Sequence, residues 1–159
     1  MNEYKNLLDK GIELIHQGKY GEAIENISKS IELKNDWEIS YFYRAVAYQA
    51  SEQMQDAILD YTKAIKLNSS MCDAYYNRAK ILLEMKNCDV DLEKIINDLD
   101  MALSLDENFV DALFAMAAAQ KKLGEYHKSL EYLERLLKLQ PDAVHARALK
   151  KLLLQKYIV

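Results

Sequence analysis

Two stretches near opposite ends of this chain share one pattern: Gly18-Lys19-Tyr20-Gly21-Glu22-Ala23-Ile24 and Gly124-Glu125-Tyr126-His127-Lys128-Ser129-Leu130. Residues 53–58 carry a weaker copy, in which Ala57 stands 34 residues after Ala23. The phrase at residues 41–45, Tyr-Phe-Tyr-Arg-Ala, also returns 34 residues later as Tyr-Tyr-Asn-Arg-Ala. Self-similarity at a period of about 20 to 50 residues indicates a repeat architecture. The sequence therefore predicts a structural unit that recurs about every 34 residues.

The units share columns of mostly small residues at helical spacing. One column contains Gly11, Ala45, Ala79 and Ala117, a second Ala23, Ala57, Ile95 and Ser129, and a third Ser30, Ala64, Ala102 and Leu136. Within a unit, Ala23, Ile27 and Ser30 stand four and three residues apart, which places them on one face of a helix. Gly18 and Gly124 stand where a short turn must join two helices. This pattern therefore predicts that each unit is a hairpin of two closely packed helices.

These hairpins resemble the tetratricopeptide repeat, with units at residues 4–37, 38–71, 72–109 and 110–143. The third unit is four residues longer than the others, and its extra length falls in the stretch 87–91. The resemblance implies an all-α fold, in which four hairpins form a right-handed superhelical array (an α-solenoid) as a single domain over residues 1–159. Ile95 at a small column and Gln120 at an apolar one depart from the family pattern.

The remaining residues, 144–159, predict one further helix. Ala146, Leu149, Leu152 and Leu153 are apolar, and basic residues alternate with them. A stack of hairpins exposes an apolar end, so the simplest interpretation is a capping helix. Two alternatives stay open: a basic amphipathic helix that binds a partner or a membrane surface, and docking of residues 157–159 on another copy of the chain.

Composition excludes several classes of protein. The chain has four Gly and one Pro, too few for the corners of a β-sandwich or barrel. Its net charge is -4 with scattered cations, which argues against binding to nucleic acid. It has neither an apolar run of about 18 residues, as a membrane span requires, nor an evident secretory signal. With only two cysteines, we expect reduced thiols and a cytoplasmic protein.

No catalytic or metal-binding constellation is evident. His16, His127 and His145 fall in different parts of the repeat pattern, without metal-ligand spacing. Cys72 and Cys88 lack the basic neighbours that activate a thiol. Residues 89–93 faintly resemble a calcium loop but lack its glycine, so we predict that they cap the start of a helix instead. We therefore expect no enzyme, no metal and no cofactor.

The resemblance implies that the first helix of each unit lines a concave groove where partners bind. On the non-core face of those helices the chain carries a run of apolar and aromatic residues, with a few polar ones beside them. Aromatic side chains give large contact area and often anchor interfaces. The predicted groove residues are Leu8, Ile12, Phe42, Tyr43, Val46, Asp73, Tyr76, Asn77, Lys80, Asp111 and Phe114. The alternative for any of these residues is burial by neighbouring helices.

The same columns argue against one family activity. Members that hold the acidic C-termini of heat-shock chaperones carry Lys and Asn, then Asn, then Lys and Arg at these positions. This chain has Leu8 and Ile12, then Tyr43, then Asp73 and Asn77. The cations are absent and an acid replaces one of them, so carboxylate-clamp binding is not expected.

The sequence therefore favours a non-enzymatic scaffold that binds a peptide or helix of a partner protein in an apolar and aromatic groove. Two other functions remain possible. One is a structural protein that self-associates through the groove or the C-terminal helix. The other is an accessory or regulatory subunit of a larger complex. The identity of the partner is not encoded in any motif.

Overall fold

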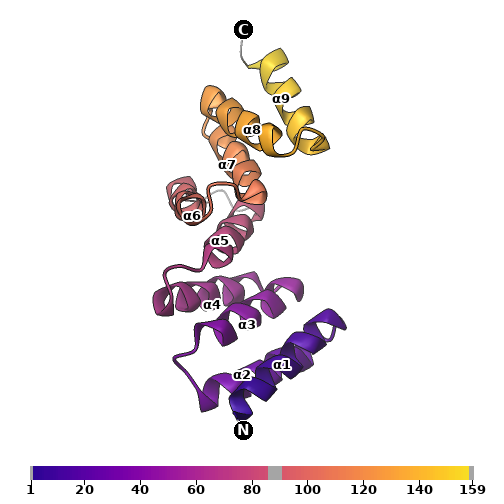
Figure 1. The fold of residues 1–159 in the computed structure, drawn as a ribbon, viewed down its shortest axis with the longest axis vertical. Coiled ribbons are helices and arrows are strands. Elements are labelled where there is room, and N and C mark those ends of the chain that lie inside the picture. Colours follow the sequence, from indigo (N-terminus) through magenta and orange to yellow (C-terminus); the bar gives the residue numbers. More distant parts are fainter. Residues whose placement is uncertain (1, 86–90, 158–159) are drawn as a thin grey trace. The chain divides into compact units, whose positions relative to one another are not determined.

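The computed structural model describes residues 2–85 and 91–157. Over these ranges it contains helices and turns and no strand, which confirms the predicted all-α fold (Figure 1). The rest of the chain, including Cys88, most of the predicted insertion and residues 158–159, lies outside the described residues. The helices are α1 (Glu3–His16), α2 (Tyr20–Leu33), α3 (Glu38–Ala50), α4 (Met54–Leu67), α5 (Cys72–Glu84), α6 (Leu92–Leu105), α7 (Val110–Lys122), α8 (Tyr126–Leu139) and α9 (Val144–Lys156).

Consecutive helices pack as hairpins, as the repeat pattern predicts. The helix α1 packs on α2, α3 on α4, and α7 on α8. Further contacts join α2 to α3, α6 to α7 and α8 to α9, so neighbouring hairpins also pack on each other. An array of helical hairpins is therefore confirmed.

The turns inside these hairpins share one hydrogen-bond pattern. In the first, the N–H of Lys19 donates to the carbonyl of Leu14, and in the last, Glu125 donates to Gln120, both at 2.9 Å. Gly18 and Gly124 have φ values of 73° and 83°, the left-handed conformation that glycine adopts without strain. In the turn between α3 and α4 the same place is held by Glu52, at φ 62°. The predicted glycine turns are confirmed, and the second hairpin makes its turn without a glycine.

The small-residue columns lie in the core. Gly11, Ala45, Ala79 and Ala117 are all buried. A Cβ atom added to Gly11 would overlap Ile27 of α2, so this helix pair needs a glycine for its close approach. Ser129, in the second column, is buried and donates a hydrogen bond of 2.7 Å to the carbonyl of Ala117. The columns therefore mark the faces where the two helices of a hairpin meet.

The chain forms two compact units, Met1–Ile81 and Leu82–Val159, and their boundary falls within α5. The first unit has a core cluster of Leu8, Ile27, Ile31, Tyr41 and Ala64. The second buries large apolar side chains from four helices, α6 to α9, among them Leu99, Leu113, Met116, Leu133 and Leu153. Each unit thus has its own core, and the single domain over residues 1–159 stays a prediction.

Two sequence predictions about helix ends are tested by the described residues. The Asp91 side chain accepts a hydrogen bond of 3.1 Å from the N–H of Lys94, so it caps the start of α6 as predicted. At the other end, α9 packs on α8 and buries Ala146 and Leu153. Tyr157 stacks on Tyr126, with ring centroids 4.4 Å apart. The helix α9 therefore covers the end of the second unit, as a capping helix does.

Candidate functional site

Leu8 was predicted to line the groove, but the structure places it in the core. Its side chain is only 2% exposed and lies in the core cluster of the first unit with Ile27 and Tyr41. The physical reason is that α1 packs against both α2 and α3, so this column of α1 is covered from two sides. Ile12, one turn further along α1, is half-buried against the same cluster. Leu8 therefore stabilises the fold and offers no surface to a partner.

The aromatic residues of α3 lie at the edge of this core. Phe42 and Tyr43 are half-buried and pack against the cluster, and Val46 is half-buried one turn later. The Phe42 ring meets Tyr43 edge-on with centroids 5.4 Å apart, and meets Tyr61 of α4 at 5.7 Å. Because Tyr61 is fully buried, its contact with Phe42 makes the Phe42 ring part of the core packing. Tyr43 and Val46 remain the α3 residues better suited to contact a partner.

Asn77 of α5 belongs to a hydrogen-bonded group around the buried Tyr61. The Tyr61 hydroxyl donates a hydrogen bond of 3.0 Å to the Gln49 side chain. Burial raises the pKa of Tyr61, while a hydrogen bond from Asn77 lowers it and the charge of Asp73 raises it again. Asn77 is a predicted groove residue, and its side chain already contacts Tyr61. The other predicted residues of α5 comprise the exposed Asp73 and the half-buried Tyr76 and Lys80.

The second unit contains a pocket that includes the two remaining predicted residues, Asp111 and Phe114. Its volume is about 280 Å³, and it lies among α7, α8 and α9, which are adjacent in Figure 1. Phe114 is half-buried, whereas Val144, at the start of α9, is 67% exposed. The pocket is lined by Val110, Asp111, Phe114, Leu136, Gln140, Ala143, Val144, His145 and Ala146. Its walls are therefore mainly apolar, with Asp111 and His145 as the titratable groups.

Val144 and His145 were not among the predicted groove residues. They come from α9, which lies in the segment predicted to be a capping helix. Extending the repeat period would have found them, because Val144 stands 34 residues after Val110, and His145 stands 34 after Asp111. The helix α9 thus continues the register of the first helices. It departs from that register at Lys151, which is exposed where the other units have a buried small residue.

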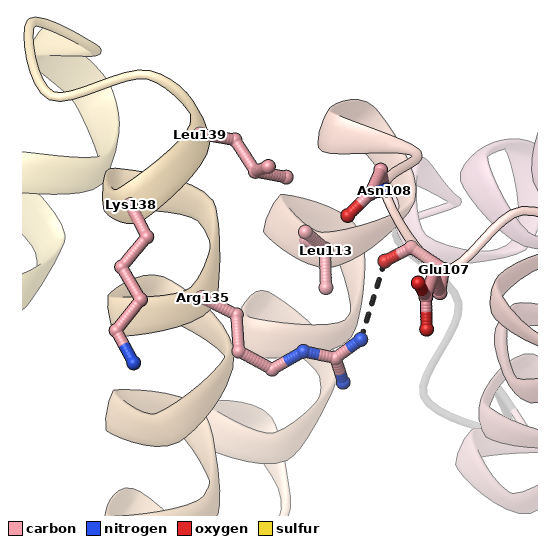
Figure 2. Close-up of a pocket in the computed structure, with 6 residues that line it drawn as sticks. All are labelled: Glu107, Asn108, Leu113, Arg135, Lys138 and Leu139. Atoms are coloured by element: carbon pink, nitrogen blue, oxygen red, sulfur yellow. Dashed lines mark hydrogen bonds between the residues drawn. The ribbon is translucent and has the colours of Figure 1, made fainter.

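Another pocket of the second unit, of about 240 Å³, contains none of the predicted residues. Figure 2 shows Arg135 reaching from α8 toward the turn between α6 and α7, where its Nη2 donates a hydrogen bond of 3.2 Å to the carbonyl of Glu107. Leu113 and Leu139 supply the apolar part of the lining, and Asn108 and Lys138 complete it. Arg135 is thus engaged in holding the turn, and its polar neighbours are exposed.

No group of three or more His, Cys, Asp or Glu side chains among residues 2–85 and 91–157 has the arrangement of a metal site. The three histidines are all exposed. Across the same described ranges, none of the helices has the length and apolar character needed to cross a membrane. The arrangement is suited to binding through shape and apolar contact.

Comparison with known families agrees with the hairpin geometry. A tetratricopeptide repeat profile matches residues 40–71, which contain most of α3 and all of α4. The profile of the Fis1 C-terminal tetratricopeptide repeat matches residues 110–158, where α7, α8 and α9 lie. The chain belongs to the tetratricopeptide repeat family. The hairpins of this tetratricopeptide repeat protein are thus confirmed as members of the family suggested by the sequence.

Curated relatives of this tetratricopeptide repeat protein are much longer chains. Human sperm-associated antigen 1 is 36% identical over 93 residues, which cover 58% of this chain and 10% of the relative. Human tetratricopeptide repeat protein 12 is 33% identical over 87 residues, which cover 55% of this chain and 12% of the relative. The chain thus spans only about a tenth of either relative.

Solved structures share the fold of this tetratricopeptide repeat protein. MamA from Desulfovibrio magneticus RS-1 superposes with a TM-score of 0.88 at 15% identity, covering 98% of this chain and 86% of MamA. The first tetratricopeptide repeat domain of Spaghetti (RPAP3), solved with an HSP90 peptide of sequence SRMEEVD, gives a TM-score of 0.71 at 26% identity. That match covers 76% of this chain and 93% of the RPAP3 chain. The MamA likeness shows the fold alone, and the RPAP3 match supports a protein-interaction scaffold.

Proposed function

We propose that this chain is a non-enzymatic scaffold that binds a peptide or helix of a partner protein, and that the pocket among α7, α8 and α9 holds an apolar side chain of that segment. The carrying observation is the pocket itself, an apolar hollow of about 280 Å³ next to the exposed Val144. A large apolar side chain with 67% exposure at the rim of a hollow is a site where a partner can bury apolar area. The peptide held by the RPAP3 domain supports the same class of activity.

The first unit supplies a second contact face in this proposal. Tyr43, Val46, Asp73, Tyr76 and Lys80 keep part of their surface accessible on α3 and α5. Leu8 takes no part because it is buried, and Phe42 takes a lesser part because it packs on Tyr61. Truncating Phe42 would therefore weaken the fold as well as any binding, and it makes a poor test of the face.

The test compares two exposed apolar residues of equal accessibility. Val144 and Leu59 are both 67% exposed, but only Val144 lines the pocket. We would immobilise the chain, its Val144→Asn variant and its Leu59→Asn variant, and capture proteins from an extract of the source cells. We expect the same partners on the parent and on Leu59→Asn, with their loss on Val144→Asn. Equal capture by all three would contradict binding in the pocket.

Self-association is the second candidate, and α9 carries the observation that favours it. Besides Val144, the α9 residues Leu152 and Leu154 remain substantially exposed. Tyr157, which one open alternative places in a segment that docks on another copy, stacks on Tyr126 within its own unit. Light scattering across a range of concentrations separates the two functions. A constant mass of 18.4 kDa identifies a monomer, and a mass that rises with concentration indicates an assembly of copies.

The proposal also excludes two kinds of ligand, acidic chaperone C-termini and nucleic acid. The scaffold does not use a carboxylate clamp, because Asp73 and Tyr43 stand where clamp members carry Lys and Asn. Nucleic acid is not its ligand, because its net charge is -4. The cytoplasmic location expected from the sequence stays a prediction.

A further inference from the structure

The α7–α9 pocket is a small hollow with mainly apolar walls. Its volume is about 280 Å³, at the lower end of the roughly 300–1,000 Å³ of ligand sites. Val110, Phe114, Leu136 and Val144 give it apolar walls. Walls of this kind can bury an apolar side chain of a protein partner.

The pocket lining contains two titratable side chains, those of Asp111 and His145. Asp111 is the single carboxylate in its lining, and neither lysine nor arginine lines it. Asp111 is exposed and takes part in none of the ion pairs found among the described residues. Its charge is thus available to a ligand. The equivalent column of α5 also carries an exposed acid, Asp73.

From this arrangement we infer that the partner segment carries a lysine or arginine side chain beside its apolar anchor, so that the anchor fills the pocket and the cation meets Asp111. This inference rests on the proposed function, since it names the chemistry of the segment that the pocket binds. An exposed carboxylate attracts a cationic side chain and repels an acidic one, and such complementarity mainly decides which partner binds. Acidic segments, including those that end in a carboxylate, are therefore selected against.

The first experiment lets the protein choose its ligand. A phage library of random 12-residue peptides, displayed with no free N-terminus, is selected on the full chain and on its Asp111→Lys variant. We expect the parent chain to enrich sequences that combine Leu, Met or Phe with a nearby Lys or Arg. The Asp111→Lys variant should keep the apolar preference and exchange the basic preference for Asp or Glu. Apolar sequences without a charge preference on either protein would overturn the inference.

The second experiment measures affinity with the strongest selected peptide, N-acetylated and fluorescently labelled, by anisotropy. Exposed ion pairs contribute about 0.2–1 kcal/mol, so Asp111→Asn should weaken binding about 1.4- to 5-fold. Asp111→Lys should weaken it further, about 10-fold. Replacing the peptide's cation by Glu should restore affinity for Asp111→Lys and lower it for the parent chain. The same Kd for all three proteins contradicts the role of Asp111.

Two controls separate this inference from the proposed function. Glu131→Lys makes the same change of charge at an exposed position of α8 that does not line the pocket, and it should leave the Kd unchanged. Val144→Asn alters the pocket without changing its charge, and it should abolish binding of every selected peptide. If the selected peptides bind Val144→Asn with the same Kd as the parent chain, they do not bind in the pocket, and the proposed function is refuted. Peptides that need Val144 but ignore the charge at residue 111 refute only the basic preference.

Discussion

Arg44 on α3 holds the carboxylate of Asp60 on α4 with two hydrogen bonds, 2.6 Å from Nε to Oδ2 and 2.9 Å from Nη2 to Oδ1. Its Nη1 donates a third bond, of 3.0 Å, to the Ser28 hydroxyl on α2. The guanidinium also lies within 6 Å of the ring centroids of Tyr41 and Tyr48. Burial lowers the pKa of Arg44, but the hydrogen bond and charge of Asp60 outweigh it and leave that pKa raised. This group joins three helices of the first unit.

Asp60→Asn should lower the stability of the first unit by about 2 kcal/mol. The Asp60 side chain is 9% exposed, so the substitution leaves a largely buried guanidinium without its counter-charge. Urea unfolding followed by circular dichroism measures the loss. The matched control is Glu25→Gln, which removes an exposed ion pair with Lys29 and should not shift the midpoint. Equal midpoints for Asp60→Asn and the parent chain would show that the pair does not stabilise the fold.

Glu52→Gly should stabilise the second hairpin by about 0.5–1 kcal/mol. Glu52 has a φ of 62°, in the region where a Cβ atom is disfavoured by about 1–2 kcal/mol, and glycine relieves that cost while losing some entropy. Gly18→Ala is the reverse change at the equivalent turn. No atom lies within 4 Å of the added Cβ, so only backbone strain is introduced and stability should fall. Thermal melts of both variants provide the measurement, and opposite shifts are the expected result.

Gln120→Leu should stabilise the second unit by about 1 kcal/mol. The Gln120 side chain is buried, and its Oε1 has no hydrogen-bond partner. An unpaired buried acceptor costs about 1–3 kcal/mol, and leucine removes it. Gln49→Leu is the informative contrast, because Gln49 accepts the hydrogen bond of the buried Tyr61 hydroxyl and its loss should destabilise the first unit. A lower unfolding midpoint for Gln120→Leu would mean that its amide is satisfied in solution.

Stability should fall at alkaline pH through Tyr61. Its pKa in the folded chain is raised above the value of about 10 in the unfolded chain, mainly by burial. Below pH 10 both states keep the proton and the contribution is constant. As the pH rises above 10, only the unfolded chain releases it, so the free energy of unfolding decreases.

The measurement for Tyr61 is the slope of stability between pH 9 and 11, compared with that of Tyr61→Phe. The other ten of the 11 tyrosines are present in both proteins, so the difference between the two slopes isolates residue 61. We expect a shallower slope for Tyr61→Phe. Identical slopes would contradict a raised pKa at this position.

The sequence alone determined the repeated hairpin. Its period of about 34 residues, the buried columns around Gly11 and Ala23, and the turns at Gly18 and Gly124 depend on contacts within one unit, which the spacing of residues along a helix encodes. The N-cap at Asp91 is equally local, because a side chain and an N–H three residues away suffice. These features were therefore predictable without any knowledge of tertiary packing.

Tertiary structure decided which groove residues are accessible. The periodic pattern identified the face of α1 that points away from α2, but only the packing of α3 shows that Leu8 on that face is covered. Likewise, Phe42 meets Tyr61, and Val144 of α9 joins Phe114 in one pocket, across separations along the chain that no short motif spans. The physical reason is that burial sums the contributions of all neighbouring helices. Periodicity, in contrast, reports only how one helix is divided between an apolar and a polar face.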